Sequence, residues 1–126
     1  YPEATQIPGL VVFRYDSPLF FANAEDFLRD ARGVIATSTP TPQWLLLNME
    51  AIVQVDVTGL DALDSLAREC ADLGISLTLV RVKLSIERLL MRHGVGERIG
   101  ADHIYPTLPT AVAAYETWRR EQGRGA

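Results

Sequence analysis

The sequence predicts a single α/β domain in which strands and helices alternate along the chain. Short, nearly continuous apolar runs at 44–49 and 75–82 are typical of strands that are covered on both faces. Between them, apolar residues in 60–73 recur every three or four positions, which indicates a helix. A chain of 126 residues with 48% hydrophobic and 22% charged residues suits one hydrophobic core, and no repeat or long linker divides it.

The first elements are expected to form an antiparallel hairpin. The segment from Gly9 to Tyr15 is strand-like, Asp16-Ser17-Pro18 is a turn signal, and Leu19-Phe20-Phe21 is a second apolar run. Asn23 then suits the N-cap of a helix. The apolar residues that this helix places on one face are Phe27, Leu28, Ala31, Val34 and Ile35.

The middle of the chain predicts a central strand followed by a helix. The run 44–49 should lie in the interior of the sheet, and 50–57 connects it to the helix. Gly74 is expected to end the helix, since glycine is common just after a helix C-terminus. The apolar stripe of the helix consists of Leu60, Leu63, Leu66, Ala67, Cys70 and Leu73.

The last third predicts a buried strand at 75–82 and two further helices, which makes about four in all. Ser85 is expected to cap the third helix, which carries Ile86, Leu89 and Leu90 and ends at Gly94. A loop punctuated by glycine follows, and 104–105 is either a short edge strand or part of the loop. A fourth helix over 109–122 should place Val112, Tyr115 and Trp118 inward, and the tail 123–126 is expected to fray.

Composition excludes several classes of protein. Nothing resembles a signal peptide, and no apolar run approaches the roughly 18 residues of a membrane span, so this chain is expected to be soluble. The lone Cys70 excludes an internal disulfide and favours a reducing compartment, and one cysteine with two histidines does not make an ordinary structural zinc site. The chain begins with Tyr1 rather than Met, which suggests a fragment or a processed product.

The charges are unevenly distributed. Residues 1–80 carry a net charge of −7 and residues 81–126 a net charge of +3, which gives −4 overall. The acidic balance argues against general nucleic-acid binding. Arg88 and Arg92 are four positions apart on one helix face, where they either bind phosphate, sulfate or an acidic partner or form a solvated surface. The basic stretch as a whole consists of Arg81, Lys83, Arg88, Arg92, His93 and Arg98.

The segment 56–60, Asp-Val-Thr-Gly-Leu, lies where a strand passes into a helix. Thr58 is predicted to cap the helix with Asp61 as its capping-box partner, and Gly59 permits a close approach. The segment has either this capping role alone or a ligand-binding or regulatory role as well. Free N–H groups at the helix start suit an anion, although Asp56 would repel one, and phosphorylation of Thr58 would alter a docking surface.

The sequence predicts no catalytic residue and no metal site. His93 and His103 have no carboxylate at ligand spacing and are expected to be caps or surface residues, and the serines lack a nucleophile-elbow context. The chain has no phosphate-binding Gly-x-x-x-x-Gly-Lys-Ser/Thr loop. The aromatic residues, which are Trp44, Trp118, Phe20, Phe21 and Phe27, favour core or interface packing over base stacking.

Three segments resemble those of STAS domains, whose founding members are the anti-sigma-factor antagonists. Residues 56–60 resemble the Asp-Ser/Thr-Ser/Thr-Gly signature, in which Thr58 matches the serine that kinases phosphorylate in the antagonists. Segments 8–14 and 18–24 are similar to the SulP transporter subgroup, with a Pro-Gly strand and a Phe-x-Asn-Ala helix start. The likeness extends over roughly 8–118. Val57 replaces the first hydroxyl residue of the signature, and 48–51 departs from the usual Asp-x-Ser.

The resemblance implies a mixed sheet of four or five strands flanked by helices. It also implies the cytoplasmic regulatory domain of a bacterial membrane transporter for sulfate or a related anion. The partners it implies are the protein's own transmembrane domain, a second copy of the chain or a cytoplasmic regulatory protein, without nucleic acid and without membrane insertion by this segment. One alternative is a free-standing signalling antagonist, with a regulatory site at Asp56, Thr58 and Gly59. A second alternative is weak sensing of GTP or ATP through Thr58, Arg88 and Arg92, and no other cofactor is expected.

Overall fold

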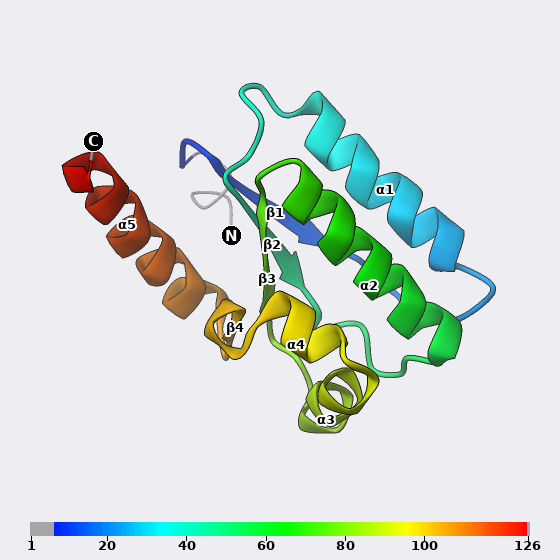
Figure 1. Cartoon of the computed structure of the whole chain (residues 1–126). Coiled ribbons are helices and arrows are strands. Elements are labelled where there is room, and N and C mark those ends of the chain that lie inside the picture. Colours follow the sequence, from blue (N-terminus) through cyan, green and yellow to red (C-terminus); the bar gives the residue numbers. More distant parts are fainter. Residues whose placement is uncertain (1–6, 126) are drawn as a thin grey trace.

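Four parallel strands form the sheet of the computed structural model, which describes residues 7–125. They lie side by side in the order β1-β2-β3-β4 (Figure 1). Arg14, Asn48 and Val80 are paired in register, so the carboxyl ends of the first three strands meet at one edge of the sheet. The strands are β1 (Leu10–Arg14), β2 (Trp44–Asn48), β3 (Ser76–Val80) and β4 (Ile104–Tyr105).

Helices cover both faces of this sheet. In Figure 1, α1 (Ala24–Thr37) and α2 (Val57–Asp72) lie together on one face, and α5 (Leu108–Gly125) lies on the other. Two shorter helices, α3 (Leu84–His93) and α4 (Val95–Ile99), lie near the carboxyl ends of the strands. The larger core therefore forms between the sheet and α1 to α4, and a smaller one forms under α5 around Trp44 and Tyr115.

The predicted antiparallel hairpin is wrong. Leu19 forms an isolated parallel bridge with Val55: its N–H donates to the carbonyl of Gln54 at 2.9 Å, and its carbonyl accepts from the N–H of Asp56 at 3.2 Å. Leu19 is fully buried by this arrangement, whereas Phe20 and Phe21 remain exposed. Within residues 7–125 the sheet is entirely parallel, so the expected mixed sheet is also wrong for this part of the chain.

The other strand predictions are confirmed, and the helix predictions need small corrections. Strand β2 lies between β1 and β3, and its first four side chains are buried. The stripe predicted for α2 is buried except at Leu73, which follows the last turn of the helix. The glycine-punctuated segment after Gly94 contains α4, which makes five α-helices in the described residues, and 104–105 is the short edge strand β4. Helix α5 continues to Gly125, three residues into the tail that we expected to fray.

The caps of the first and third helices differ from expectation. Asn23 precedes α1, but its side chain stabilises the preceding turn: it accepts from the N–H of Phe20 at 3.0 Å and donates to the carbonyl of Pro18 at 2.7 Å. The cap predicted at Ser85 is wrong, because α3 begins one residue earlier, at Leu84. Gly94 ends α3 as predicted, with a positive φ of 85° that suits glycine.

Candidate functional site at the carboxyl end of the sheet

Asp56, not Thr58, caps helix α2. The Asp56 Oδ1 atom accepts a hydrogen bond from the N–H of Gly59 at 2.8 Å, and Oδ2 accepts one from the N–H of Phe21 at 2.9 Å. Asp56 has the extended backbone of an N-cap residue, whereas Thr58 is already inside the first turn, where its side chain is exposed. The predicted capping box of Thr58 and Asp61 is therefore wrong.

Gly59 permits the close approach that the sequence predicted. It is buried, and a Cβ atom at this position would collide with the carbonyl oxygen of Leu19 and lie 2.9 Å from Cγ1 of Val55. The first turn of α2 therefore packs directly against the segment that leads from β1 to α1. Any larger residue would force these segments apart.

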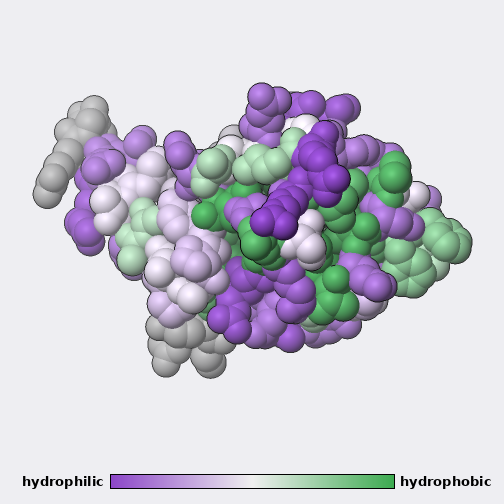
Figure 2. Space-filling view, turned by 90° about the horizontal axis from the view of Figure 1, so that it is seen from below, coloured by the Kyte–Doolittle hydropathy of each residue, from purple (hydrophilic) through white to green (hydrophobic). Residues whose placement is uncertain are grey.

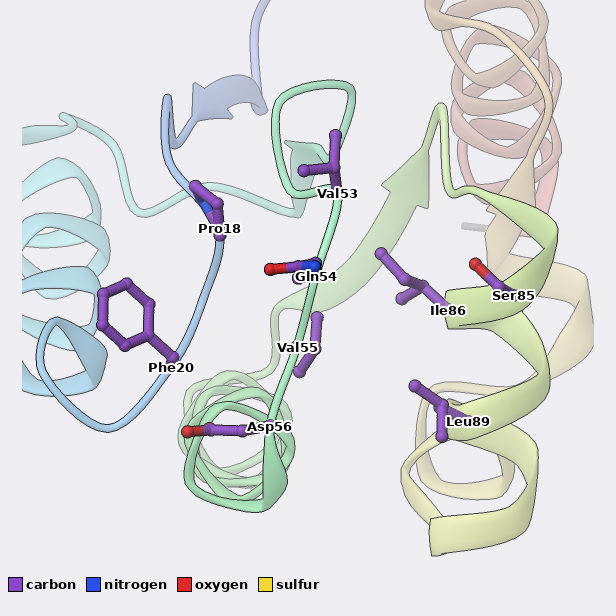
Figure 3. A pocket seen from close by; sticks show the side chains of 9 residues that line it. All are labelled: Pro18, Phe20, Val53, Gln54, Val55, Asp56, Ser85, Ile86 and Leu89. Carbon is purple, nitrogen blue, oxygen red and sulfur yellow. The ribbon is translucent and has the colours of Figure 1, made fainter.

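A hollow of about 620 Å³ lies between helix α3 and two segments of the chain, residues 18–20 and residues 53–56. Figure 3 shows Ile86 and Leu89 of α3 pointing toward the central segment, whereas the Asp56 carboxylate points toward the segment that carries Phe20. Gln54, Asp56 and Ser85 are the polar lining residues. The apolar ones are Pro18, Phe20, Val53, Val55, Ile86 and Leu89.

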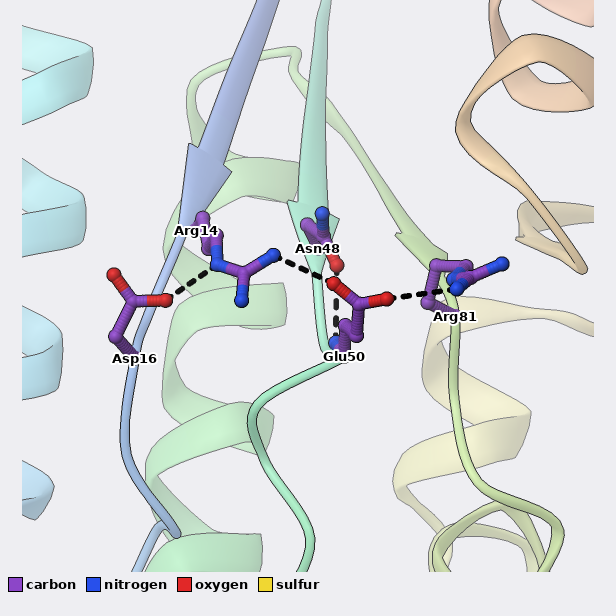
Figure 4. Close-up of polar contacts among 5 residues, drawn as sticks. All are labelled: Arg14, Asp16, Asn48, Glu50 and Arg81. Atoms are coloured by element: carbon purple, nitrogen blue, oxygen red, sulfur yellow. Dashed lines mark hydrogen bonds and ion pairs between the residues drawn. The ribbon is translucent and has the colours of Figure 1, made fainter. Parts of the chain in front are cut away.

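Ion pairs link the ends of three adjacent strands (Figure 4). Glu50, which follows β2, accepts from Arg14 Nη1 and from Arg81 Nη2, each at 2.7 Å, and Arg14 also pairs with Asp16. The backbone N–H of Glu50 donates to Asn48 Oδ1 at 3.0 Å. The hydrogen bonds from Arg14 and then from Arg81 hold the pKa of Glu50 below its ordinary value. The Glu50 carboxylate therefore occupies the space between the two guanidinium groups.

Thr58 does not line the hollow that Arg88 and Arg92 border. The two arginines lie on the outer side of α3, where they border a shallow hollow with Glu87 and Met91. Thr58 lines neither this hollow nor the one beside Asp56. A common anion or nucleotide contact of Thr58 with the arginines stays a prediction.

The two histidines have different surroundings. His93 Nε2 lies 3.3 Å from Oδ1 of Asp61, a partner 32 residues away that no local spacing indicated. His103 was expected at a cap or on the surface, but it is half-buried, with Nδ1 3.1 Å from Oγ1 of Thr78 and its ring against Trp44. This burial lowers the pKa of His103.

Cys70 is buried in the core, and burial raises the pKa of its thiol to about 11. Within residues 7–125, no group of three His, Cys, Asp or Glu side chains is placed to hold a metal ion. In the same part of the chain, no helix has both the length and the apolar character that a membrane crossing requires.

Exposed apolar side chains surround the carboxyl end of the sheet. Phe21 is 74% exposed, Val57 63% and Val53 47%. In Figure 2, which views the molecule from below Figure 1, hydrophobic side chains flank hydrophilic ones on this face. The packing expected of Trp44 and Trp118 is confirmed under α5, whereas Phe20 is 37% exposed and contacts the more exposed ring of Phe21 edge to face.

These features define a class: a parallel α/β domain whose capped helix start, apolar hollow and ion-pair network meet at one end of the sheet. The STAS domain family matches residues 1–111, and the chain belongs to this family.

Curated relatives with this domain include much longer proteins. The chain is 49% identical over 115 residues to a probable sulfate transporter of Mycobacterium tuberculosis, covering 91% of this chain and 20% of that protein. It is 32% identical over 124 residues to sulfate transporter 1.2 of Arabidopsis thaliana, covering 90% and 19%. The chain thus spans about a fifth of the length of these relatives.

Solved structures share the fold. A sulfate transporter family protein from Wolinella succinogenes matches with a TM-score of 0.78 and 26% identity over 93% of this chain and 96% of that one. The murine solute carrier 26 family member A9 anion transporter matches with a TM-score of 0.79 and 28% identity, over 88% of this chain and 18% of the transporter. A putative anti-sigma factor antagonist from Thermotoga maritima, at 18% identity, matches in fold alone, with a TM-score of 0.71 over 86% of this chain and 88% of that one.

Proposed function

We propose that this chain is the STAS domain of a bacterial transporter for sulfate or a related anion. On the cytoplasmic side of the membrane, it regulates transport or assembly through contacts with the transmembrane domain and carries out no chemistry itself. The observation that carries this proposal is the 49% identity, over 91% of the chain, to a protein named as a probable sulfate transporter. The plant relatives with the same kind of name support it.

The carboxyl end of the sheet is the surface that best suits this contact. Large apolar side chains are exposed there at Phe21, Val53 and Val57, next to the hollow that Ile86 and Leu89 line. Clusters of exposed apolar side chains commonly mark protein interaction sites. Hydrogen bonds also fix the position of this surface, because Asp56 joins the start of α2 to the segment that leads into α1.

A domain exchange tests the proposal. The STAS domain of the Mycobacterium tuberculosis relative is deleted, or replaced by this chain, and sulfate uptake is measured together with the amount of transporter in the membrane. We expect deletion to reduce uptake or membrane abundance and this chain to restore both. Equal uptake and abundance with and without the domain would contradict a regulatory or assembly role.

Matched variants of the exchanged chain locate the contact. We expect Phe21→Asp to prevent the restoration, because a charged side chain opposes burial against a partner. Leu73→Asp is the control, since Leu73 is 56% exposed at the opposite end of α2. Equal effects of both variants would show that the contact is not made at the carboxyl end of the sheet.

A further inference from the structure

Helix α3 exposes apolar side chains on the side that faces away from the core. Leu84 is 60% exposed and Met91 45% exposed, whereas Ile86 and Leu90 are buried on the inner side. Positions 84, 88 and 91 follow the three-to-four-residue spacing that places side chains on one helix face. Leu84, Arg88 and Met91 therefore form a stripe along the outer surface of α3.

Arg88 lies in this stripe and Lys83 and Arg92 lie beside it, while Glu87 lines the same hollow as Arg88, Met91 and Arg92. Within residues 7–125, the side chains of Lys83, Arg88 and Arg92 make no hydrogen bond or ion pair. By contrast, Arg32 pairs with Glu69 at 2.7 Å and Arg98 with Asp64 at 2.6 Å. Although the chain has a net charge of −4, these three cations have no partner of opposite charge among residues 7–125.

The helix also has an accessible position. In Figure 1, α3 lies beyond the carboxyl ends of the strands and outside the layers formed by α1, α2 and α5. In Figure 2, the face seen from this end carries hydrophilic and hydrophobic side chains close together. We call the group Lys83, Leu84, Arg88, Met91 and Arg92 the basic face of α3.

We propose that the basic face of α3 binds the surface of an anionic lipid bilayer. Lys83, Arg88 and Arg92 bind the phosphate headgroups, while Leu84 and Met91 enter the boundary between headgroups and acyl chains. Apolar side chains flanked by lysine and arginine are typical of helices that lie in this interface. Binding is peripheral and orients the carboxyl end of the sheet toward the membrane, which goes beyond the proposed regulatory role.

Vesicle sedimentation of the 126-residue chain tests this. We expect binding to vesicles of equal parts phosphatidylcholine and phosphatidylglycerol, little binding to phosphatidylcholine alone, and weaker binding as salt rises. Arg88→Gln with Arg92→Gln should weaken the binding about 25-fold, because each basic residue near an anionic surface contributes a factor of about five. The control Arg119→Gln with Arg120→Gln changes the net charge equally but on α5, and should leave binding unchanged.

A fluorescent label tests the orientation. An environment-sensitive dye on Leu84→Cys should shift to the blue with anionic vesicles, whereas the same dye on Gly33→Cys should not. Gly33 is exposed on α1 and has open space around it, so this control tolerates the label. Cys70 is buried, which leaves the introduced cysteine as the reactive one.

Three outcomes would overturn the proposal. These are equal binding to both kinds of vesicle, equal weakening by the α3 and α5 variants, and binding to polyglutamate without binding to vesicles. The last would assign the basic face to an acidic protein segment instead. Because vesicle binding requires no transporter, its failure is distinguishable from a failure of the domain exchange.

Discussion

The carboxylate of Asp56 accepts a hydrogen bond at 2.9 Å from the backbone N–H of Phe21, 35 residues earlier in the chain. Its other oxygen caps α2 through Gly59. One side chain thus fixes the start of the second helix and the segment that leads into the first. This contact explains why the exposed apolar residues at the carboxyl end of the sheet have a defined position.

Removal of the Asp56 side chain should therefore destabilise the domain. We expect Asp56→Ala to lower the free energy of unfolding by about 2 kcal/mol, since it removes a helix cap and a hydrogen bond to a charged group. Thr58→Ala should change it by less than about 0.5 kcal/mol, because Thr58 makes no cap. Urea unfolding measures both. Equal losses would mean that Thr58 has a capping role.

Two glycines in helices should respond oppositely to alanine. Gly59→Ala should cost about 2 kcal/mol, since its methyl group would press against the carbonyl of Leu19 and the side chain of Val55. Gly33→Ala, with open space around it, should add about 0.5 to 1 kcal/mol by favouring the helix. Thermal unfolding of the pair checks this. A stabilising Gly59→Ala would show that α2 does not pack so closely.

The burial of His103 makes stability depend on pH. Because its pKa in the folded protein is lower than the ordinary 6.5, the unfolded chain binds a proton first as the pH falls. The stability that the protein gains from keeping His103 neutral is fully present above about pH 6.5, and it is lost as the pH decreases toward the pKa of the folded protein. We expect the urea midpoint to fall over that range. His103→Gln should remove this part of the dependence and His93→Gln should retain it.

Cys70 should report on global unfolding. With the thiol buried and its pKa raised to about 11, we expect almost no reaction with a thiol reagent at pH 8 in the folded protein. The rate should rise across the urea transition in step with the loss of circular dichroism. Rapid labelling without denaturant would indicate a local opening of α2.

GTP and ATP sensing can be tested residue by residue. Titration of either nucleotide into isotope-labelled protein should shift the resonances of Arg88 and Arg92 and leave those of Thr58 in place, because Thr58 does not line the hollow that the two arginines border. Thr58→Ala should then leave the titration unchanged, and Arg88→Gln with Arg92→Gln should weaken it. Absence of any shift at millimolar nucleotide would contradict nucleotide binding.

The sequence identified most elements because their apolar patterns are local. The run 44–49 indicated a central strand, and the spacing from Leu60 to Cys70 indicated the buried side of α2. The sequence also identified Asp56, Thr58 and Gly59 as a helix start with a candidate binding or regulatory role. It assigned the cap to the wrong residue, however, because Asp and Thr are both good N-caps and only the backbone conformation distinguishes them.

The failed predictions depend on contacts between distant segments. A turn signal followed by Leu19-Phe20-Phe21 is equally compatible with a hairpin and with a parallel bridge, and Val55, 36 residues later, decides between them. The burial of His103 against Thr78 arises in the same way, whereas His93 lies at the surface as expected and contacts Asp61.

The sequence by itself determined an α/β domain with one core, a central strand at 44–49 and an uneven charge distribution, since hydrophobic periodicity and composition require no knowledge of neighbours. The tertiary structure alone decided that Asp56 joins two helix starts and that Glu50 lies between Arg14 and Arg81. It also decided that Lys83, Arg88 and Arg92 have no acidic partner within residues 7–125. These features depend on which side chains the parallel strands and their crossovers bring within a few ångströms, and separation along the chain does not specify that.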